Sequence, residues 1–562
     1  MSNLEVQERI ILSDRIIFKN VDGLTIVGYF DHLPDYTGNR FIVIPPAYGE
    51  TKKDYISLSY YLVSNGFNVV RYDNTFHLGE SEGEILNADL TRIYDDLLAT
   101  LQFVEQHFGQ HEVGVVASSL TARIALKVAA NDRRIVFLVN LVGVTSLEET
   151  LKAIYQEDVI GEYKSGKRWG TIDIFGHEVN DTFIENAIDF KFHDLESTIE
   201  DVRSIDSPIV FFVAAEDAWI RSEDVRRLVQ VARHPETEMR VIPGAMHQLQ
   251  ENPRLAKLVI SEIVVDCVRY LMGKRMTIAE IAQPDLHDIV AQNKAELQNL
   301  KRLSQVTKRG EKDFWCKYLS KFSIILRSPD YQEMMRSVEQ LVGSPREGDQ
   351  ILDAGCGSGH FGVWLLQRIL EEQDRGRNLP RMFRYIGLDF VSNALAQARL
   401  RHHDTVQSLL DEYGKRGLAQ WQFDYVVSDL DDGLPFPNGY FHKVCCNLVI
   451  SYLQHPLEAM GSLTRVLRIG GKVVVSSLKP YCDLSLVYRN FAELTRNEEE
   501  LLEARSLLSS TGKIRQKESE GHYHFYSESE LYDLMTQAGL LDVKVFRTLG
   551  NQANIAVGEK RD

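Results

Sequence analysis

Cysteine is scarce in this 562-residue chain, and long hydrophobic runs are missing. Its six cysteines include the adjacent pair Cys445 and Cys446 but show no CxxC or zinc-type spacing. The sequence therefore indicates reduced thiols and predicts neither a disulfide framework nor a metal site. No stretch approaches the roughly 18 apolar residues of a membrane-spanning helix. The opening residues, MSNLEVQERIILSDR, are charged rather than signal-like, and together these features favour a cytoplasmic protein without a membrane span.

Basic side chains are also in deficit. The chain has 63 lysines and arginines against 80 aspartates and glutamates, a net charge of −17. This balance disfavours a nucleic-acid backbone as the main partner. Hydrophobic residues at 44% and charged residues at 25% are typical of a globular protein, which excludes a disordered, collagen-like or coiled-coil chain. At about 100–200 residues per domain, the length predicts two or more domains.

Apolar runs of strand length alternate with helical patterns in two separate parts of the chain, residues 1–275 and 311–562. In the first part, continuous apolar strands predict a mostly parallel sheet covered on both faces by helices. Residues 147–205 break this rhythm, as an inserted cap over a sheet would. Residues 276–310 form a polar helical connector, and the second α/β part has different glycine spacing, so it is no repeat of the first.

A serine lies at a strand-to-helix junction in the segment VGVVASSLTARIA. Ser119 has the small side chains of Ala117 and Thr121 two residues away on either side. This arrangement is typical of a nucleophile elbow, where bulk at the flanks would clash. A serine at a helix N-cap is the alternative interpretation of the same residues.

Two later residues complete a hydrolase pattern. Asp217 follows the apolar run at 208–213, and His247 follows the run at 239–242. The chain order Ser, Asp, His is that of the α/β-hydrolase fold, so we expect Ser119, Asp217 and His247 to act as a catalytic triad. The backbone N–H groups of Leu120 and Ala47 are the predicted oxyanion-hole donors.

The first 300 or so residues resemble the bacterial luminescence acyltransferase family, whose members are myristoyl-acyl-carrier-protein thioesterases. The matching stretches are FNVVRYDNTFHLGESEG, VVASSLTARIA, IFGHEVNDTFI, AAEDAWIRSEDV and GAMHQLQENP. The resemblance implies an α/β-hydrolase fold and a serine thioesterase or acyltransferase that acts on long acyl thioesters. It also implies that the 147–205 insertion is the cap over the acyl chain.

A glycine-rich loop, DAGCGSG, follows the predicted strand at 350–352 in the second part. Asp353, Gly355, Gly357 and Gly359 form its framework, and such glycines let a backbone approach a ligand closely. Alone, the loop would also fit a dinucleotide. The candidates for the rest of the site end the next three predicted strands: Asp389 for ribose hydroxyls, Asp429 for an adenine amine, and Asn447.

This succession of strands and acids resembles class I S-adenosylmethionine-dependent methyltransferases over roughly residues 311–562. The resemblance implies a Rossmann-like fold, S-adenosylmethionine as cofactor and a small-molecule methyl acceptor. Trp315, Tyr318 and Tyr331, before the glycine loop, are candidates for a substrate lid, with core packing as the alternative.

Together the two parts predict a bifunctional enzyme acting on a carrier-bound fatty-acyl or polyketide-type thioester, with an acyl-carrier protein as partner. The basic connector, including Lys301, Arg302, Lys308 and Arg309, is a candidate carrier-docking surface, with a solvated helix face as the alternative. Three other functions stay open: biotin-pathway-like methyl-ester formation and hydrolysis, acyl transfer to an amine or alcohol, and a non-catalytic carrier-binding first domain.

Overall fold

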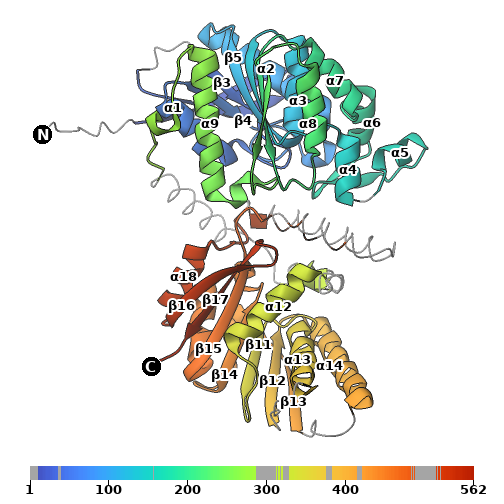
Figure 1. The fold of residues 1–562 in the computed structure, drawn as a ribbon, viewed down its shortest axis with the longest axis vertical. Coiled ribbons are helices and arrows are strands. Elements are labelled where there is room, and N and C mark those ends of the chain that lie inside the picture. The colour runs from blue at the N-terminus through green and yellow to red at the C-terminus, as the bar shows by residue number, and fades with distance from the viewer. Residues whose placement is uncertain are drawn as a thin grey trace, which may run out of the picture. The chain divides into compact units, whose positions relative to one another are not determined.

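The computed structural model folds the chain into two compact units, residues 1–292 and 293–562, which Figure 1 draws as one ribbon. In the part of the chain that the structure describes, no helix is long and apolar enough to cross a membrane. The described residues are 10–35, 40–155, 157–286, 312, 314–316, 318–319, 328–374, 382–413, 420–482, 484, 487, 491, 514, 517–518 and 521–561.

The first unit is built on an eight-stranded sheet. Its strands β3 to β6, β9 and β10 run parallel, and β1 and β2 extend one edge in antiparallel pairing. The mostly parallel sheet predicted from the apolar runs is therefore confirmed. In spatial order the strands are β1 (Leu12–Lys19), β2 (Thr25–His32), β4 (Asn68–Tyr72), β3 (Phe41–Ile44), β5 (Val113–Ser118), β6 (Ile135–Leu141), β9 (Ile209–Ala214) and β10 (Glu238–Ile242).

Helices cover both faces of this sheet (Figure 1). Helices α1 and α9 share one hydrophobic core with the strands, while α2, α3, α7 and α8 contact one another in succession. Long apolar strands need this double cover because neither face can be left to water. The bounds are α1 (Ile56–Ser64), α2 (Leu90–Phe108), α3 (Ser119–Asn131), α7 (Leu195–Ser204), α8 (Ser222–Val231) and α9 (Pro253–Met272).

The insertion after β6 forms the predicted cap, apart from α7, which packs on α3 and α8 as part of the main fold. Its centre is a two-stranded hairpin of β7 and β8 joined by a tight turn. The cap elements are α4 (Leu147–Tyr155), α5 (Val159–Lys164), β7 (Thr171–Ile174), β8 (His177–Asn180) and α6 (Thr182–Asp189).

The start of the predicted connector belongs to the first unit. Ile281 is buried in its core, and the side-chain amide of Asn65, the C-cap residue of α1, forms hydrogen bonds with both the N–H and the carbonyl of Ala282, at 2.9 and 3.0 Å. The basic residues predicted to dock a carrier lie outside the described residues. The predicted domain boundaries at residues 275 and 310 stay predictions.

The second unit is a seven-stranded sheet in the order expected of a Rossmann-like methyltransferase fold. Five strands are parallel, and the two that follow pair antiparallel at one edge. In spatial order they are β13 (Gln420–Val427), β12 (Met382–Asp389), β11 (Gln350–Ala354), β14 (Phe441–Asn447), β15 (Leu467–Leu478), β17 (Ala553–Glu559) and β16 (Leu541–Thr548).

The sheet of the second unit separates two hydrophobic cores, one on each of its faces. Adjacent Cys445 and Cys446 on β14 belong to different cores, because successive strand residues point to opposite faces of a sheet. Both thiols are buried and unpaired. The helix bounds are α12 (Pro329–Val342), α13 (His360–Asp374), α14 (Ser392–Tyr413), α15 (Pro456–Val466) and α18 (Glu528–Gln537).

Candidate active sites

Ser119 lies at the sharp turn from β5 into α3. It is the first residue of the helix, and its φ of +51° lies in the left-handed region. A non-glycine residue in that region is strained, and such strain concentrates at functional sites. The turn brings the Ser119 hydroxyl to 2.9 Å from Nε2 of His247. This geometry favours the nucleophile elbow over an ordinary helix cap.

The imidazole of His247 is held from two sides. Its Nδ1 lies 2.9 Å from Oδ2 of Asp217, and both side chains are almost fully buried. The other oxygen of Asp217 accepts the N–H groups of Trp219 and Ile220, at 2.7 and 3.1 Å. The Trp219 ring stacks on the imidazole with centroids 4.2 Å apart. The carboxylate therefore fixes the tautomer in which Nε2 accepts a proton from Ser119.

The two predicted oxyanion donors differ in their surroundings. Leu120 is the second residue of α3, where a backbone N–H has no acceptor within the helix. The Ala47 N–H instead donates to the hydroxyl of Tyr55, at 3.0 Å. That hydroxyl donates to Glu50 at 2.5 Å and lies 2.8 Å from Oγ of Ser118. The role of Ala47 stays a prediction, and it requires this N–H to exchange Tyr55 for the substrate oxygen.

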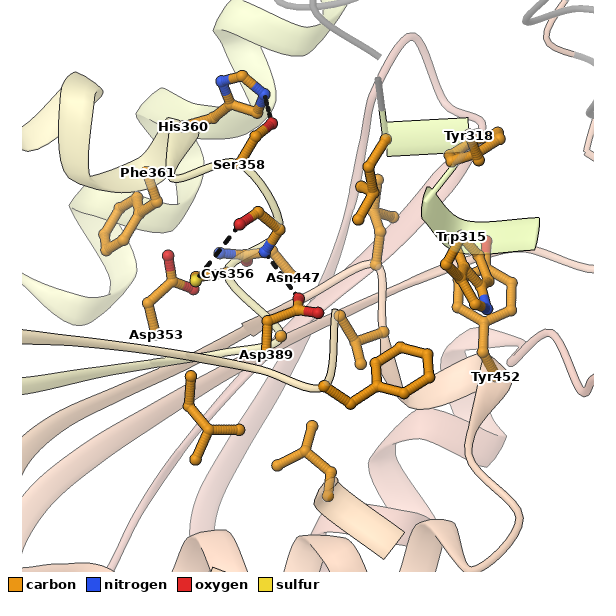
Figure 2. Close-up of a pocket in the computed structure, with 18 of the residues that line it drawn as sticks. Trp315, Tyr318, Asp353, Cys356, Ser358, His360, Phe361, Asp389, Asn447 and Tyr452 are labelled. Atoms are coloured by element: carbon orange, nitrogen blue, oxygen red, sulfur yellow. Dashed lines mark hydrogen bonds between the residues drawn. The ribbon is translucent and has the colours of Figure 1, made fainter. Parts of the chain in front are cut away.

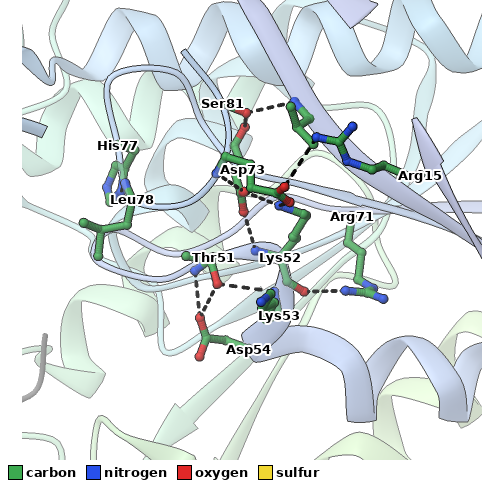
Figure 3. A network of polar contacts seen from close by, with 12 residues as sticks. Arg15, Thr51, Lys52, Lys53, Asp54, Arg71, Asp73, His77, Leu78 and Ser81 are labelled. Carbon is green, nitrogen blue, oxygen red and sulfur yellow. Dashed lines mark hydrogen bonds and ion pairs between the residues drawn. The ribbon is translucent and has the colours of Figure 1, made fainter. Parts of the chain in front are cut away.

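A buried ion-pair network supports the short helix Lys52–Tyr55 that carries Tyr55 (Figure 3). The Lys52 ammonium pairs with Asp73 and with Glu80, and the Lys52 and Asp73 side chains are at most 1% exposed. The Lys52 N–H also donates to Asp73, at 2.7 Å, and the Arg71 guanidinium donates to the Lys52 carbonyl, at 2.8 Å. The loop beside the nucleophile is therefore anchored by charge as well as by packing.

The cap adds aromatic rings to the same site. Phe175, in the turn of the β7–β8 hairpin, stacks on Trp219 with centroids 5.1 Å apart. Tyr48, next to Ala47, meets Phe175 edge-on at 6.0 Å. The Tyr155 hydroxyl anchors the turn by accepting the Phe175 N–H at 2.6 Å. The cap thus places an apolar wall against the ring that covers the histidine.

The glycine loop of the second unit needs its glycines. Gly355, Gly357 and Gly359 have φ values of +76°, +51° and +84°. A β-carbon on Gly355 would lie 2.5 Å from a methyl group of Val449, and one on Gly359 would lie 2.7 Å from the β-carbon of Ala398. Both the backbone conformation and the space therefore exclude a side chain at these positions.

Carboxylates at the strand ends surround this loop. Asp389 accepts the N–H groups of Gly357 and Val391, at 2.9 and 2.8 Å, and burial raises the pKa of its carboxyl group. Asp353 is buried, which raises its pKa to about 7, while the hydroxyl of Tyr385 donates to it at 2.6 Å and opposes that rise. Asp389 therefore helps to hold the loop in shape before any ligand is bound.

Six of the seven predicted cofactor residues line one pocket (Figure 2). They are Asp353, Gly355, Gly357, Asp389, Asp429 and Asn447. Gly359 is not among the lining residues, and its α-carbon instead faces α14. The side-chain amide of Asn447 is buried and makes no hydrogen bond to any described residue. Since a buried amide without a partner is costly, the pocket suits a ligand that supplies one.

Two family comparisons match the two units. Residues 34–301 match the acyl transferase family, and residues 326–545 match a methyltransferase domain family. The chain is an enzyme that fuses an acyl transferase-like domain to a methyltransferase domain.

The acyl transferase-like domain is similar to proteins that are themselves acyl transferases. An acyl transferase of Photobacterium leiognathi is 28% identical over 264 residues, 46% of this chain and 86% of the relative. One of Shewanella hanedai is 29% identical and spans 38% of this chain and 69% of the relative. The solved structure of Est1E from Butyrivibrio proteoclasticus with ferulic acid covers 45% of this chain and 99% of its own, at 16% identity and a TM-score of 0.38.

One structural feature of the methyltransferase domain was missed in the sequence. His402 on α14 has Nε2 2.6 Å from the carbonyl of Gly359 and Nδ1 2.7 Å from the hydroxyl of Tyr425. Its ring lies against Gly359 and Gly362, where a β-carbon would come within 2.8 and 2.3 Å of Nε2. A lone histidine in a helical pattern gives no signal of such a contact, because the contact depends on how α14 packs on the loop.

Proposed function

We propose that this chain is a bifunctional biosynthetic enzyme. Its acyl transferase-like domain is a serine acyl-thioesterase or acyltransferase, and its methyltransferase domain methylates a small molecule with S-adenosylmethionine. The substrate is a fatty-acyl or polyketide-type thioester on an acyl-carrier protein. The observation that carries this proposal is the hydrogen-bonded series Ser119–His247–Asp217 on a strained strand-to-helix turn.

The acyl-transfer mechanism follows from the positions of these side chains. His247 Nε2 takes the hydroxyl proton as Ser119 Oγ attacks the thioester carbonyl, and Asp217 stabilises the imidazolium that forms. The N–H groups of Leu120 and Ala47 bind the oxyanion, the latter after leaving Tyr55. The carrier thiol then leaves, and an acyl ester on Ser119 remains for water or another acceptor to attack.

The pocket of the methyltransferase domain fits S-adenosylmethionine, which supplies a methyl group already activated on a sulfonium. The glycine loop would lie against the methionine part, Asp389 would accept the ribose hydroxyls, and Asp429 would accept the adenine amine. The buried amide of Asn447 would gain the hydrogen bonds that it lacks among the described residues. These residues bind and orient, and orientation accounts for most of what such a transfer needs.

Intact-mass spectrometry tests the acyl-transfer half. The full chain and a Ser119→Ala variant are mixed with acyl-carrier-protein thioesters of graded chain length. We expect a transient acyl adduct on the wild type alone, with loss of thioester, and the length that reacts fastest gives the specificity. Thioester loss that is equal in both proteins, or none at any length, would reject a serine thioesterase. Adding amines or alcohols to the reaction separates transfer from hydrolysis.

We also propose that the basic connector docks the acidic carrier protein. Charge reversal of Lys301, Arg302, Lys308 and Arg309 is then expected to raise KM for the carrier thioester and to weaken its dependence on salt. The matched substrate is the same acyl group on a small thiol, whose KM should not change. An unchanged KM for the carrier thioester would reject docking at this segment.

A further inference from the structure

The pocket of the methyltransferase domain has two unlike walls (Figure 2). One wall is polar and consists of the glycine loop with the strand-end residues assigned above to the cofactor. The other wall carries the aromatic rings of Trp315, Tyr318 and Tyr452, and the Trp315 ring contacts both tyrosine rings, with centroids 5.3 and 4.5 Å apart. Apolar side chains, among them Met334, Met335, Leu478 and Leu549, also line the pocket. If the methyl acceptor binds against this second wall, an apolar molecule suits it.

No side chain on that wall is a base, as far as the described lining residues go. The carboxylates that line the pocket lie on the cofactor side, within or shortly after β11, β12 and β13. The one histidine among the described lining residues, His360, begins α13 directly after the glycine loop and contacts Ser358 at 2.9 Å and Arg401 at 3.0 Å. Burial and the nearby Arg401 lower its pKa to about 3, so it is a poor proton acceptor. Among the described lining residues, a phenol or an amine would find no group on that wall to take its proton.

The tyrosines that line the pocket keep their hydroxyl protons. Burial raises the pKa of Tyr318, Tyr331 and Tyr452 above the ordinary value. A protonated phenol donates a hydrogen bond to an anion without cancelling its charge. An apolar wall with such donors suits a molecule that is mostly hydrocarbon and carries one negative oxygen group.

Electrostatics favours the same acceptor. A carboxylate is ionised at neutral pH without help from the protein, since its unperturbed pKa is about 4. In a pocket of low dielectric its attraction to a sulfonium is much stronger than in water. The transfer also removes both charges, so the apolar wall stabilises the products relative to the separated ions.

We propose that the methyl acceptor is the carboxylate of a free acyl chain, so that the methyltransferase domain forms fatty-acid methyl esters. One carboxylate oxygen forms a bond to the methyl carbon as the carbon–sulfur bond breaks and its electron pair stays on sulfur. The products are a neutral ester and a neutral thioether, and no proton moves. This inference rests on the proposed function, because it takes the polar wall as the S-adenosylmethionine site.

The test uses the full chain, S-adenosylmethionine with a ¹³C-labelled methyl group, and saturated fatty acids of graded length. We expect labelled methyl esters by mass spectrometry. From about pH 8 to about pH 9 kcat should stay flat, because the acid is already ionised and Asp353, whose pKa is about 7, has already titrated. Tyr318→Phe and Tyr452→Phe should each raise KM for the acid several-fold and leave the calorimetric Kd for S-adenosylmethionine unchanged. Tyr532→Phe, at a half-exposed position on α18, is the matched control and should change neither.

The outcomes distinguish a wrong methyl acceptor from a wrong proposed function. If S-adenosylmethionine binds but no acid is methylated, the carboxylate acceptor is wrong and the methyltransferase assignment stands. If a phenol or amine is methylated instead, with kcat rising over that pH range, the acceptor class is also wrong. If S-adenosylmethionine does not bind, the proposed function itself fails.

Discussion

The hydroxyl of Tyr55 binds the backbone N–H of Ala47, which is predicted to be an oxyanion-hole donor. It accepts the Ala47 N–H, donates to Glu50, and contacts Ser118. Tyr55→Phe keeps the ring and removes all three interactions. Ala47 is only 5% exposed, so its N–H is left without this acceptor, and an unsatisfied buried donor costs about 1–3 kcal/mol. At about 2–4 °C per kcal/mol, a loss of about 2 kcal/mol lowers the unfolding temperature by about 4–8 °C.

The same substitution should speed acylation. In the wild type, the Ala47 N–H must give up its bond to Tyr55 before it can bind the oxyanion. A typical hydrogen bond has a net value of about 0.5–1.5 kcal/mol. Removing that competing bond lowers the barrier by up to this amount, which corresponds to a rate increase of about 2- to 12-fold. The variant is therefore expected to be less stable and faster.

Both quantities are measurable on one protein preparation. Thermal unfolding gives the stability, and the burst of p-nitrophenol from a p-nitrophenyl acyl ester gives the acylation rate constant. Tyr61→Phe is the control, because Tyr61 is as deeply buried but its hydroxyl donates to Gln283, at 2.7 Å. It should lose stability without a change in rate. A Tyr55→Phe variant that is both less stable and slower would refute the reasoning, since Tyr55 would then hold the loop in its active position.

Three further substitutions test other parts of the molecule. Asp73→Asn leaves the buried Lys52 ammonium without its buried carboxylate partner and should lower the free energy of unfolding by about 3–5 kcal/mol. The control is Glu80→Gln, at a 44% exposed side chain, which should lower it by less than about 1 kcal/mol. Chemical denaturation measures both values. His402→Phe removes the hydrogen bond to the Gly359 carbonyl and should weaken S-adenosylmethionine binding about tenfold by calorimetry, which corresponds to about 1.4 kcal/mol. The control is His403→Phe, at a 75% exposed side chain, which should leave the binding unchanged. Equal effects of the two substitutions would refute a role for His402 in positioning the loop. Asp217→Asn should slow acylation by about 10³–10⁴-fold, because the amide favours the wrong tautomer of the histidine, and an unchanged burst rate would remove Asp217 from the triad.

The parts of the fold that carry a local signature were predictable from the sequence. Continuous apolar strands, the turn at Ser119 and the glycines at 355–359 each depend on residues adjacent in the chain, so pattern and spacing suffice. Ser119, Asp217 and His247 each follow a strand of the parallel part of the sheet, so the three side chains lie at the edge where the carboxyl ends of these strands meet. The structure brings them within hydrogen-bonding distance.

Contacts between distant segments were not predictable in this way. Tyr55 is separated from Ser118 by 63 residues and His402 from Gly359 by 43, and nothing in the local sequence of either residue marks the pairing. Asp73 and Lys52 look like ordinary surface charges in the sequence. They are buried because each charge offsets the cost of burying the other, and the two meet only when the chain is fully packed. The competition for the Ala47 N–H is likewise visible only when both segments are in place.

The two proposed reactions require selectivity at the acyl carbonyl. The acyl transferase-like domain must cleave a thioester and must not hydrolyse the methyl ester that the methyltransferase domain forms. The difference in leaving group offers a way to separate them. A thiol, with a pKa of about 8.5, leaves as a thiolate with little help, whereas an alcohol needs a full proton from His247 as the bond breaks. The stacked Trp219 ring and the buried Asp217 hold that imidazole in one orientation. If this orientation favours attack by Ser119 over proton delivery to an alkoxide, the site cleaves thioesters faster than methyl esters of the same chain. The acyl transferase-like domain then leaves the methyl ester intact.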